Sequence, residues 1–226
     1  MSLRAVLFDA AGTLIHVRTL VGATYARIAC AHGVIAAPDA LERAFRTAIR
    51  AMPDMVFPDA SAAECAALER AWWSELVNRV VTAAAPEARF DDFLAYFDAV
   101  FAHYAQPDAW MVADGATTTL AALRTAGLTL GVVSNFDHRL PGLLDGLGVS
   151  SFFDVVVRPA DASAAKPNPR IFHAALTQLG VRPSDALYVG DDDEEDVRGA
   201  TAAGLHAVNI ATLPEFDALL DYVTRR

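Results

Sequence analysis

Arg4-Ala5-Val6-Leu7-Phe8-Asp9 is a short apolar run that ends on a carboxylate, and the turn-forming pair Gly12-Thr13 follows closely. An apolar run of this length that stops at turn-forming residues is typical of a buried strand. In α/β folds, functional groups gather at the carboxyl ends of the strands. The sequence therefore predicts a core strand that ends near Asp9 and leads into a functional turn.

The segment after Gly115 alternates between helical and strand-like patterns. Gly127, Gly180 and Gly204 each end a predicted helix. The expected strands cover residues 128–134, 152–157, 186–189 and 207–210, with helices over residues 118–126, 169–180 and in the segments that end near 147 and 203. Repeated strand–helix units predict a parallel sheet covered on both faces. We expect an α/β fold with a Rossmann-like three-layer α/β/α core.

The region between residues 17 and 107 has a different pattern, which predicts helices almost throughout. Leu41, Phe45 and Ile49 recur at helical spacing. Two candidate capping boxes precede helical runs: Asp39 with Glu42, and Ser61 with Glu64. We therefore expect a core domain of residues 1–16 and 108–226, and a helical cap domain of residues 17–107 inserted after the first strand.

Composition excludes several classes of protein. The net charge is −10, with 17 arginines spread along the chain and a single lysine, which argues against a nucleic-acid-binding surface. No apolar run approaches the roughly 20 residues of a membrane-spanning helix. Cys30 and Cys65 lack the spacing of a zinc site or a disulfide framework, and a reducing cytoplasm fits them best. We expect a cytoplasmic protein without a membrane partner, either a monomer or a homodimer.

Four groups of polar residues fall at the ends of predicted core strands or close to them. They read Phe8-Asp9-Ala10-Ala11-Gly12-Thr13-Leu14, Val133-Ser134-Asn135, Lys166-Pro167-Asn168-Pro169-Arg170-Ile171-Phe172, and Gly190-Asp191 followed by Asp196. This set resembles the four motifs of the haloacid dehalogenase-like (HAD) superfamily, in the same order and over nearly the whole chain. The resemblance implies that the helical insertion is a C1 cap.

The resemblance also implies a chemistry. Asp9 would be a nucleophile that forms a covalent aspartyl intermediate on a small phosphorylated substrate, with Mg²⁺ as cofactor. The implied catalytic residues are Asp9, Ser134 and Lys166. The implied substrate-binding residues are Gly12, Thr13, Ser134, Asn135 and Lys166. The implied metal site comprises Asp9, the backbone carbonyl of Ala11, Asp191 and Asp196, the last of which would hold a metal-bound water or orient Lys166.

Other polar residues near the motifs have simpler interpretations. The acidic residues between Asp191 and Asp196 are typical of a solvated helix start, which the helix dipole favours. His138 and Arg139 fit either a substrate contact or a solvated helix start. Lys166 is different, because the one lysine of a chain rich in arginine falls on a motif position.

Ala11 departs from the pattern of most HAD phosphatases, which have a second Asp at this position. Alanine cannot transfer a proton, and general acid–base catalysis commonly contributes about 10² to 10⁴ in rate. A phosphonatase needs a cap lysine, and no lysine exists outside position 166. A haloacid dehalogenase remains an alternative, although Gly190-Asp191 argues against it. A pseudoenzyme that binds without turnover is a further alternative, which the retention of Asp9, Lys166 and Asp191 disfavours.

Overall fold

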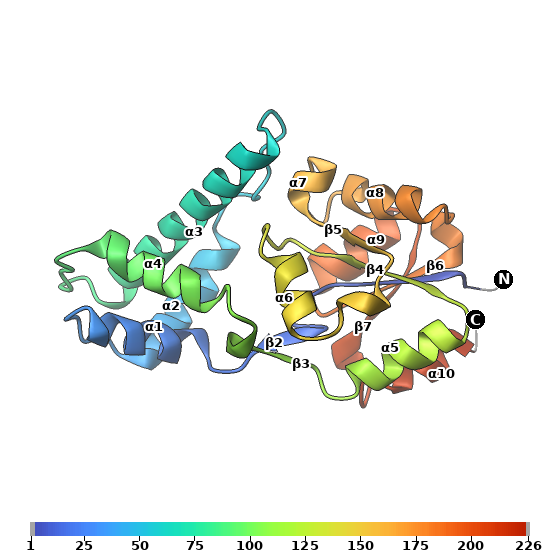
Figure 1. The fold of residues 1–226 in the computed structure, drawn as a ribbon, viewed down its shortest axis with the longest axis horizontal. Helices are drawn as coiled ribbons and strands as arrows, with labels where there is room; N and C mark the ends of the chain where they lie inside the picture. The colour runs from blue at the N-terminus through green and yellow to red at the C-terminus, as the bar shows by residue number, and fades with distance from the viewer. Residues whose placement is uncertain (1–2, 225–226) are drawn as a thin grey trace. The chain divides into compact units, whose positions relative to one another are not determined.

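The computed structural model describes residues 3–224, which divide into two compact units (Figure 1). The first unit runs to His16, includes Val56–Asp59 and resumes at Met111. The second unit consists of Val17–Met55 and Ala60–Trp110. None of the described helices is both long and apolar enough to cross a membrane.

The strands are β1 (Ala5–Phe8), β2 (Ile15–Val17), β3 (Trp110–Val112), β4 (Thr129–Val133), β5 (Val155–Val157), β6 (Ala186–Gly190) and β7 (His206–Asn209). The α-helices are α1 (Val21–Ala31), α2 (Pro38–Arg50), α3 (Ala62–Ala84), α4 (Phe93–His103), α5 (Ala116–Thr125), α6 (Leu140–Gly146), α7 (Pro159–Ala162), α8 (Pro169–Leu179), α9 (Gly199–Ala202) and α10 (Ala218–Thr224). The shorter helical turns are η1 (Pro107–Ala109), η2 (Ser150–Phe152), η3 (Pro183–Asp185), η4 (Asp193–Arg198) and η5 (Ile210–Thr212), of which η4 is π-helical.

A five-stranded parallel sheet forms the centre of the first unit, with the order β5-β4-β1-β6-β7. Phe8, the last residue of β1, lies opposite Val132 of β4 and Val189 of β6. The carboxyl ends of these three strands therefore lie side by side at one edge of the sheet. The strand order reverses at β1, and such a switch point is where ligands bind in open α/β sheets.

Helices cover both faces of this sheet, with α8 and α9 on one side and α5 and α10 on the other (Figure 1). Side chains alternate between the two faces as the strand period requires. Leu7 belongs to a buried cluster with Phe172 of α8, whereas the Phe8 ring stacks on Phe216 at 6.3 Å. The predicted α/β class and three-layer core are confirmed.

The second unit is built from α1, α2, α3 and α4 around a buried apolar cluster that includes Leu41. The predicted capping box at the start of α3 is confirmed, because the Ser61 hydroxyl accepts from the Glu64 amide and the Glu64 carboxylate accepts from the Ser61 amide at 2.8 Å. The other predicted capping box, Asp39 with Glu42, is wrong. α2 begins at Pro38, whose fixed φ suits a first helical position, so Asp39 lies inside the helix.

The Glu42 carboxylate has a different role from the predicted one. It accepts a hydrogen bond of 2.8 Å from the Gly22 amide in the first turn of α1. A side chain from α2 thus satisfies one of the backbone donors that a helix start leaves free.

A two-stranded sheet pairs β2 with β3. Two of the boundaries between the units fall within these strands, after His16 and after Trp110. The strand expected at residues 152–157 is shorter than predicted and covers only Val155–Val157. Its first part forms the 3₁₀ turn η2 instead, where the Phe152 amide donates to the Val149 carbonyl.

Candidate active site

The carboxyl ends of three adjacent strands bring the predicted site residues together. Asp9 follows β1, Ser134 follows β4 and Asp191 follows β6. Lys166 comes from the loop before α8, and Asp196 comes from η4. Ligand atoms of Asp9, Asp191 and Asp196 lie within 4.8 Å of one another, so residues far apart in the sequence form one acidic centre.

Lys166 is buried inside this centre, with 3% of its surface exposed. Its Nζ atom lies 2.6 Å from Asp9 Oδ1 and 2.5 Å from Asp196 Oδ1. A third partner is the Tyr188 hydroxyl at 3.2 Å. An ammonium group has three N–H donors, and all three have a partner here. Lys166 therefore has little freedom to change its position relative to Asp9.

Asp196 uses both of its carboxylate oxygens within the protein. Oδ1 accepts from Lys166, and Oδ2 accepts from the backbone amides of Asp191 and Asp192 at 3.0 Å each. Gly190 makes this close approach possible, because a Cβ atom there would lie 2.3 Å from the Asp196 carboxylate carbon. Of the two roles expected for Asp196, the contacts favour the orientation of Lys166 and of the loop after β6.

Gly12 and Thr13 contact the acidic centre at Asp191. The Thr13 hydroxyl donates to Asp191 Oδ1 at 3.1 Å, and Thr13 itself is buried. Gly12 has a φ of +101° and passes directly beside the Asp191 carboxylate. Their contacts thus orient Asp191, while the substrate-binding role expected for them stays a prediction.

Ser134 is buried, and its hydroxyl makes no hydrogen bond with any part of the described chain. It is therefore available to a ligand. Asn135 is occupied, because its Oδ1 accepts from the Lys166 amide at 2.7 Å and its Nδ2 donates to the Lys166 carbonyl at 3.0 Å. The same Nδ2 lies 3.0 Å from Glu195 Oε2. Through these contacts Asn135 links the loop after β4 to the loop that carries Lys166. Its contact with substrate stays a prediction.

Burial dominates the electrostatics of the site. It raises the pKa of Asp9 from 3.8 to about 6, Lys166 opposes this shift, and Asp196 and Asp191 add to it. Burial also raises the pKa of Asp191. Burial alone would lower the pKa of Lys166, but Asp9 and Asp196 raise it overall, so the ammonium stays charged. Three carboxylates thus share one cation, which favours the binding of a further cation.

The acidic residues after Asp191 begin a helical turn, as predicted. The Asp192 side chain accepts from the amides of Glu194 and Glu195 at 2.8 and 2.9 Å.

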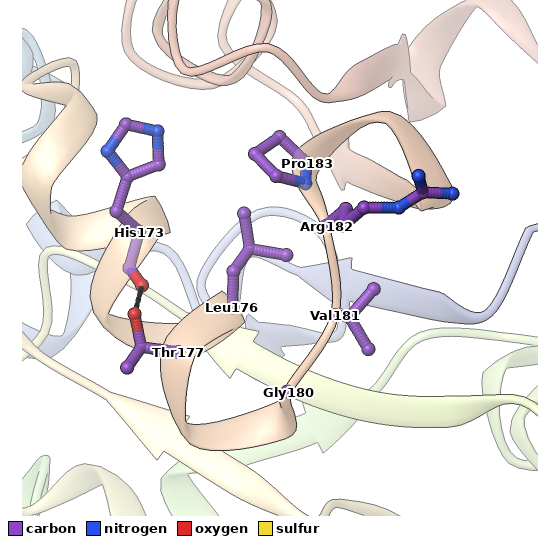
Figure 2. Close-up of a pocket in the computed structure, with 7 residues that line it drawn as sticks. All are labelled: His173, Leu176, Thr177, Gly180, Val181, Arg182 and Pro183. Atoms are coloured by element: carbon purple, nitrogen blue, oxygen red, sulfur yellow. Dashed lines mark hydrogen bonds between the residues drawn. The ribbon is translucent and has the colours of Figure 1, made fainter.

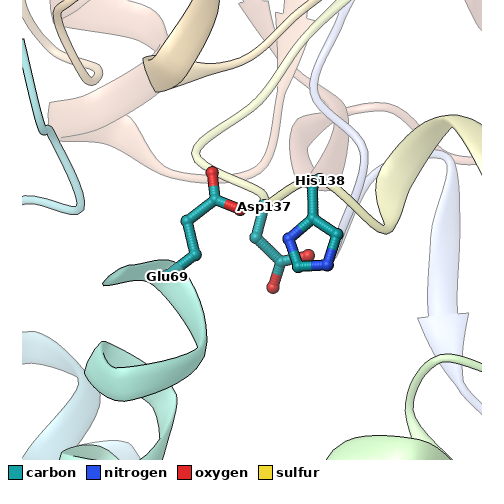
Figure 3. A group of neighbouring side chains, drawn as sticks. All are labelled: Glu69, Asp137 and His138. Carbon is teal, nitrogen blue, oxygen red and sulfur yellow. The ribbon is translucent and has the colours of Figure 1, made fainter. Parts of the chain in front are cut away.

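Arg139, in contrast, is not part of a solvated helix start. Its side chain is only 8% exposed and pairs with the fully buried Asp137, which Figure 3 shows beside the exposed His138. Glu69, also drawn there, belongs to α3 of the second unit.

A separate pocket of about 310 Å³ lies on the first unit, lined by His173, Leu176, Thr177, Gly180, Val181, Arg182 and Pro183 (Figure 2). It lies where the chain enters β6, whereas Asp191 follows the other end of that strand. Its polar side chains already have partners: His173 Nε2 lies 3.0 Å from the Ala203 carbonyl, and Arg182 pairs with Asp185. This pocket is therefore not part of the acidic centre.

Tyr188 and the tethering contacts of Asn135 were not predicted from the sequence. Tyr188 lies three residues before Asp191 and looks like an ordinary core residue of a buried strand. Its hydroxyl contacts Lys166 and Asp196, which lie in a loop and in η4, so only the three-dimensional structure shows these neighbours.

Comparisons with known proteins identify the family of the chain. The family model described as haloacid dehalogenase-like hydrolase matches residues 3–204. Haloacid dehalogenase-like hydrolase domain-containing protein 3 of Mus musculus is 36% identical over 219 residues, which cover 96% of this chain and 86% of that protein. A glyceraldehyde 3-phosphate phosphatase of Methanopyrus kandleri is 37% identical over 136 residues, which cover 60% of this chain and 56% of that protein.

Solved structures share the fold. The crystal structure of an L-2-haloacid dehalogenase has a TM-score of 0.72 at 22% identity and covers 99% of this chain and 100% of that chain. The family model and the mouse relative extend over most of the sequence, and the residues of the acidic centre lie within the range 3–204 that the family model matches. The chain therefore belongs to the haloacid dehalogenase-like hydrolases, and it is a hydrolase with phosphatases among its relatives.

Proposed function

We propose that this protein is a Mg²⁺-dependent phosphatase that acts on a small phosphorylated metabolite through an aspartyl-phosphate at Asp9. The observation that carries the proposal is the position of Asp9 at the end of β1, where Lys166 holds one of its oxygens at 2.6 Å and Asp191 lies close by. A nucleophilic carboxylate needs neighbours that neutralise the oxygens of the phosphoryl group. The relative named as a glyceraldehyde 3-phosphate phosphatase supports phosphate as the substrate class.

The donor set fits Mg²⁺, which prefers oxygen ligands and keeps several waters. Asp9, Asp191 and the carbonyl of Ala11 would hold the ion, and that carbonyl accepts no hydrogen bond from the residues between 3 and 224. The contacts of Asp196 with Lys166 and with two backbone amides suit a supporting role. When bound, the metal neutralises negative charge on the transferring phosphoryl group and on the carboxylates.

The side chains of the protein carry out the covalent step and bind the phosphoryl group. One carboxylate oxygen of Asp9 forms a bond to phosphorus while the bond to the leaving oxygen breaks, and water later cleaves the aspartyl-phosphate to release inorganic phosphate. Lys166 and the Ser134 hydroxyl would bind the equatorial oxygens of the phosphoryl group, since Ser134 is otherwise without a partner among the described residues.

Ala11 limits which phosphates are good substrates. Its methyl group cannot protonate a leaving alkoxide. We expect preference for substrates whose leaving group departs without a proton, such as aryl and acyl phosphates. Haloacid dehalogenation is the second candidate, because an L-2-haloacid dehalogenase shares the fold and because that reaction needs no acid at this position. A catalytically weak binding protein is a third.

A substrate panel tests these alternatives. Aryl, acyl and alkyl phosphates and 2-haloacids are incubated with the wild type and with Asp9→Asn, each with Mg²⁺ and with a chelator. The asparagine keeps the shape of the side chain but is a poor nucleophile, so we expect Mg²⁺-dependent phosphate release by the wild type alone. Equal activity in Asp9→Asn, with an unchanged thermal melt, would remove Asp9 from the mechanism. Halide release without phosphate release would favour the dehalogenase.

A further inference from the structure

Tyr188 is a fully buried residue in the middle of β6. Its ring packs edge to face against Phe172, with centroids 5.0 Å apart and an interplanar angle of 82°. It also belongs to the apolar cluster that contains Leu7 and Val133. A phenylalanine would fill the same space, so packing explains the ring but not the hydroxyl group.

The hydroxyl has three polar neighbours. It lies 2.7 Å from the Val133 carbonyl, 3.2 Å from Lys166 Nζ and 3.2 Å from Asp196 Oδ1. A hydroxyl has one hydrogen and two lone pairs. The Val133 carbonyl is the nearest acceptor, so the hydrogen points to it, and the oxygen is then free to accept from the Lys166 ammonium. This arrangement ties Lys166 to the backbone at the end of β4.

Lys166 needs this third contact. Two of its N–H groups donate to the carboxylates of Asp9, in the loop after β1, and of Asp196, in η4, and the lysine stem is flexible. A buried N–H without a partner is costly, so loss of the third acceptor would let the ammonium move. We infer that Tyr188 is a positioning residue, which fixes the Lys166 ammonium at the point where it meets both Asp9 and Asp196.

The position of this ammonium affects Asp9 directly. Lys166 engages Asp9 Oδ1, which directs the second oxygen of the carboxylate away from the lysine. Only this kinetic consequence rests on the proposed function. In the proposed phosphatase, a less firmly held ammonium would misplace the nucleophile and the phosphoryl oxygens together. The expected effect falls on kcat more than on KM, because it concerns the alignment of reacting groups.

The sequence offers a direct probe, because Lys166 is the only lysine. Labelling with ¹⁵N-lysine gives a single Nζ signal, whose hydrogen exchange with water is measured by NMR in the full chain. Removal of the Tyr188 hydroxyl leaves one buried N–H group of the Lys166 ammonium without its acceptor, so exchange is expected to speed up by about tenfold or more. This measurement does not depend on turnover.

The test variant is Tyr188→Phe, which keeps the ring and removes only the hydroxyl. Tyr96→Phe is the matched control, because Tyr96 is also fully buried but its hydroxyl has no hydrogen-bond partner in the part of the chain that is described. Phe172→Leu is a second control, which disturbs the packing of the Tyr188 ring and leaves the hydroxyl. We expect fast exchange in Tyr188→Phe alone, with a lower kcat on an aryl phosphate.

Two results would overturn the inference. One is exchange in Tyr188→Phe as slow as in the wild type, and the other is an equal acceleration in Phe172→Leu, which would reduce Tyr188 to a packing residue. Fast exchange in Tyr188→Phe together with a wild type that hydrolyses no phosphate would contradict the proposed function and leave the role of Tyr188 intact.

Discussion

Gly12 and Asp191 approach so closely that a Cβ atom on the glycine would lie 2.5 Å from Asp191 Oδ2. The two residues are far apart in the sequence, yet the loop after β1 and the loop after β6 meet here without room for a side chain. Gly12 also has a φ of +101°, which L-residues rarely adopt. The Asp191 carboxylate is therefore placed by a backbone contact in addition to the hydrogen bond from Thr13.

Substitution of Gly12 by alanine is expected to weaken Mg²⁺ binding by about tenfold or more, because the new methyl group displaces one of two direct carboxylate ligands. Gly127→Ala is the matched control. Gly127 also has a positive φ, of +82°, but a Cβ atom there meets nothing within 4 Å. Both variants are expected to lose about 1 to 3 kcal/mol of folding stability from backbone strain.

Calorimetric titration with Mg²⁺ and a thermal melt separate the two effects. The contact predicts that only Gly12→Ala loses affinity. An equal loss in both variants would mean that backbone strain, and not the contact with Asp191, explains the defect.

Asp191→Asn is expected to abolish measurable Mg²⁺ binding at millimolar concentrations, because the amide removes the negative charge from a site with few protein ligands. Asp193→Asn removes the same charge two residues away, where the side chain accepts a hydrogen bond from Asn209. If the negative charge of the whole segment attracted the ion, both variants would bind Mg²⁺ equally weakly. A specific site predicts near-normal affinity in Asp193→Asn.

Acidification is expected to weaken Mg²⁺ binding. Burial raises the pKa of Asp9 to about 6, so below that pH the metal-free protein holds a proton that the ion must displace. Above it Asp9 is already ionised, and this part of the pH dependence disappears. The raised pKa of Asp191 acts in the same direction. Each displaced proton lowers the affinity about tenfold per pH unit.

Titrations from about pH 5 to about pH 8, in buffers of different ionisation enthalpy, report both the affinity and the protons released. An affinity that does not change between about pH 5 and about pH 7 would show that Mg²⁺ does not displace a proton from Asp9 when it binds.

Two members of the acidic centre, Asp9 and Asp191, could be predicted from the sequence because they follow apolar runs. Asp9 and Asp191 lie at strand ends, and parallel strands bring those ends to one edge whatever the details of packing. The roles of Tyr188 and Asn135 depend on which atoms meet across strands and loops, so these roles could be identified only from the three-dimensional structure. The wrong capping box at Asp39 has a local cause, since the N-cap is Ala37, two residues before Asp39, and the pattern of polar residues does not show that Pro38 begins the helix.

Ala11→Asp is expected to increase Mg²⁺-dependent hydrolysis of alkyl phosphates more than that of aryl phosphates. An aryloxide leaves with little protonation, whereas an alkoxide needs a proton in the transition state, which an acid near the bridging oxygen must deliver. Ala11 is exposed, so a longer side chain has room at this position. A tenfold gain corresponds to about 1.4 kcal/mol of barrier, well above assay error.

The measurement compares kcat/KM for one alkyl and one aryl phosphate in the wild type, Ala11→Asp and Ala11→Asn. The asparagine matches the size of the new side chain but supplies no proton, so a gain it shares would reflect shape or polarity and not acid catalysis. No gain on either substrate would imply that another residue already supplies the proton. A gain confined to the aryl phosphate would contradict the argument from leaving-group protonation, because that substrate needs the acid least.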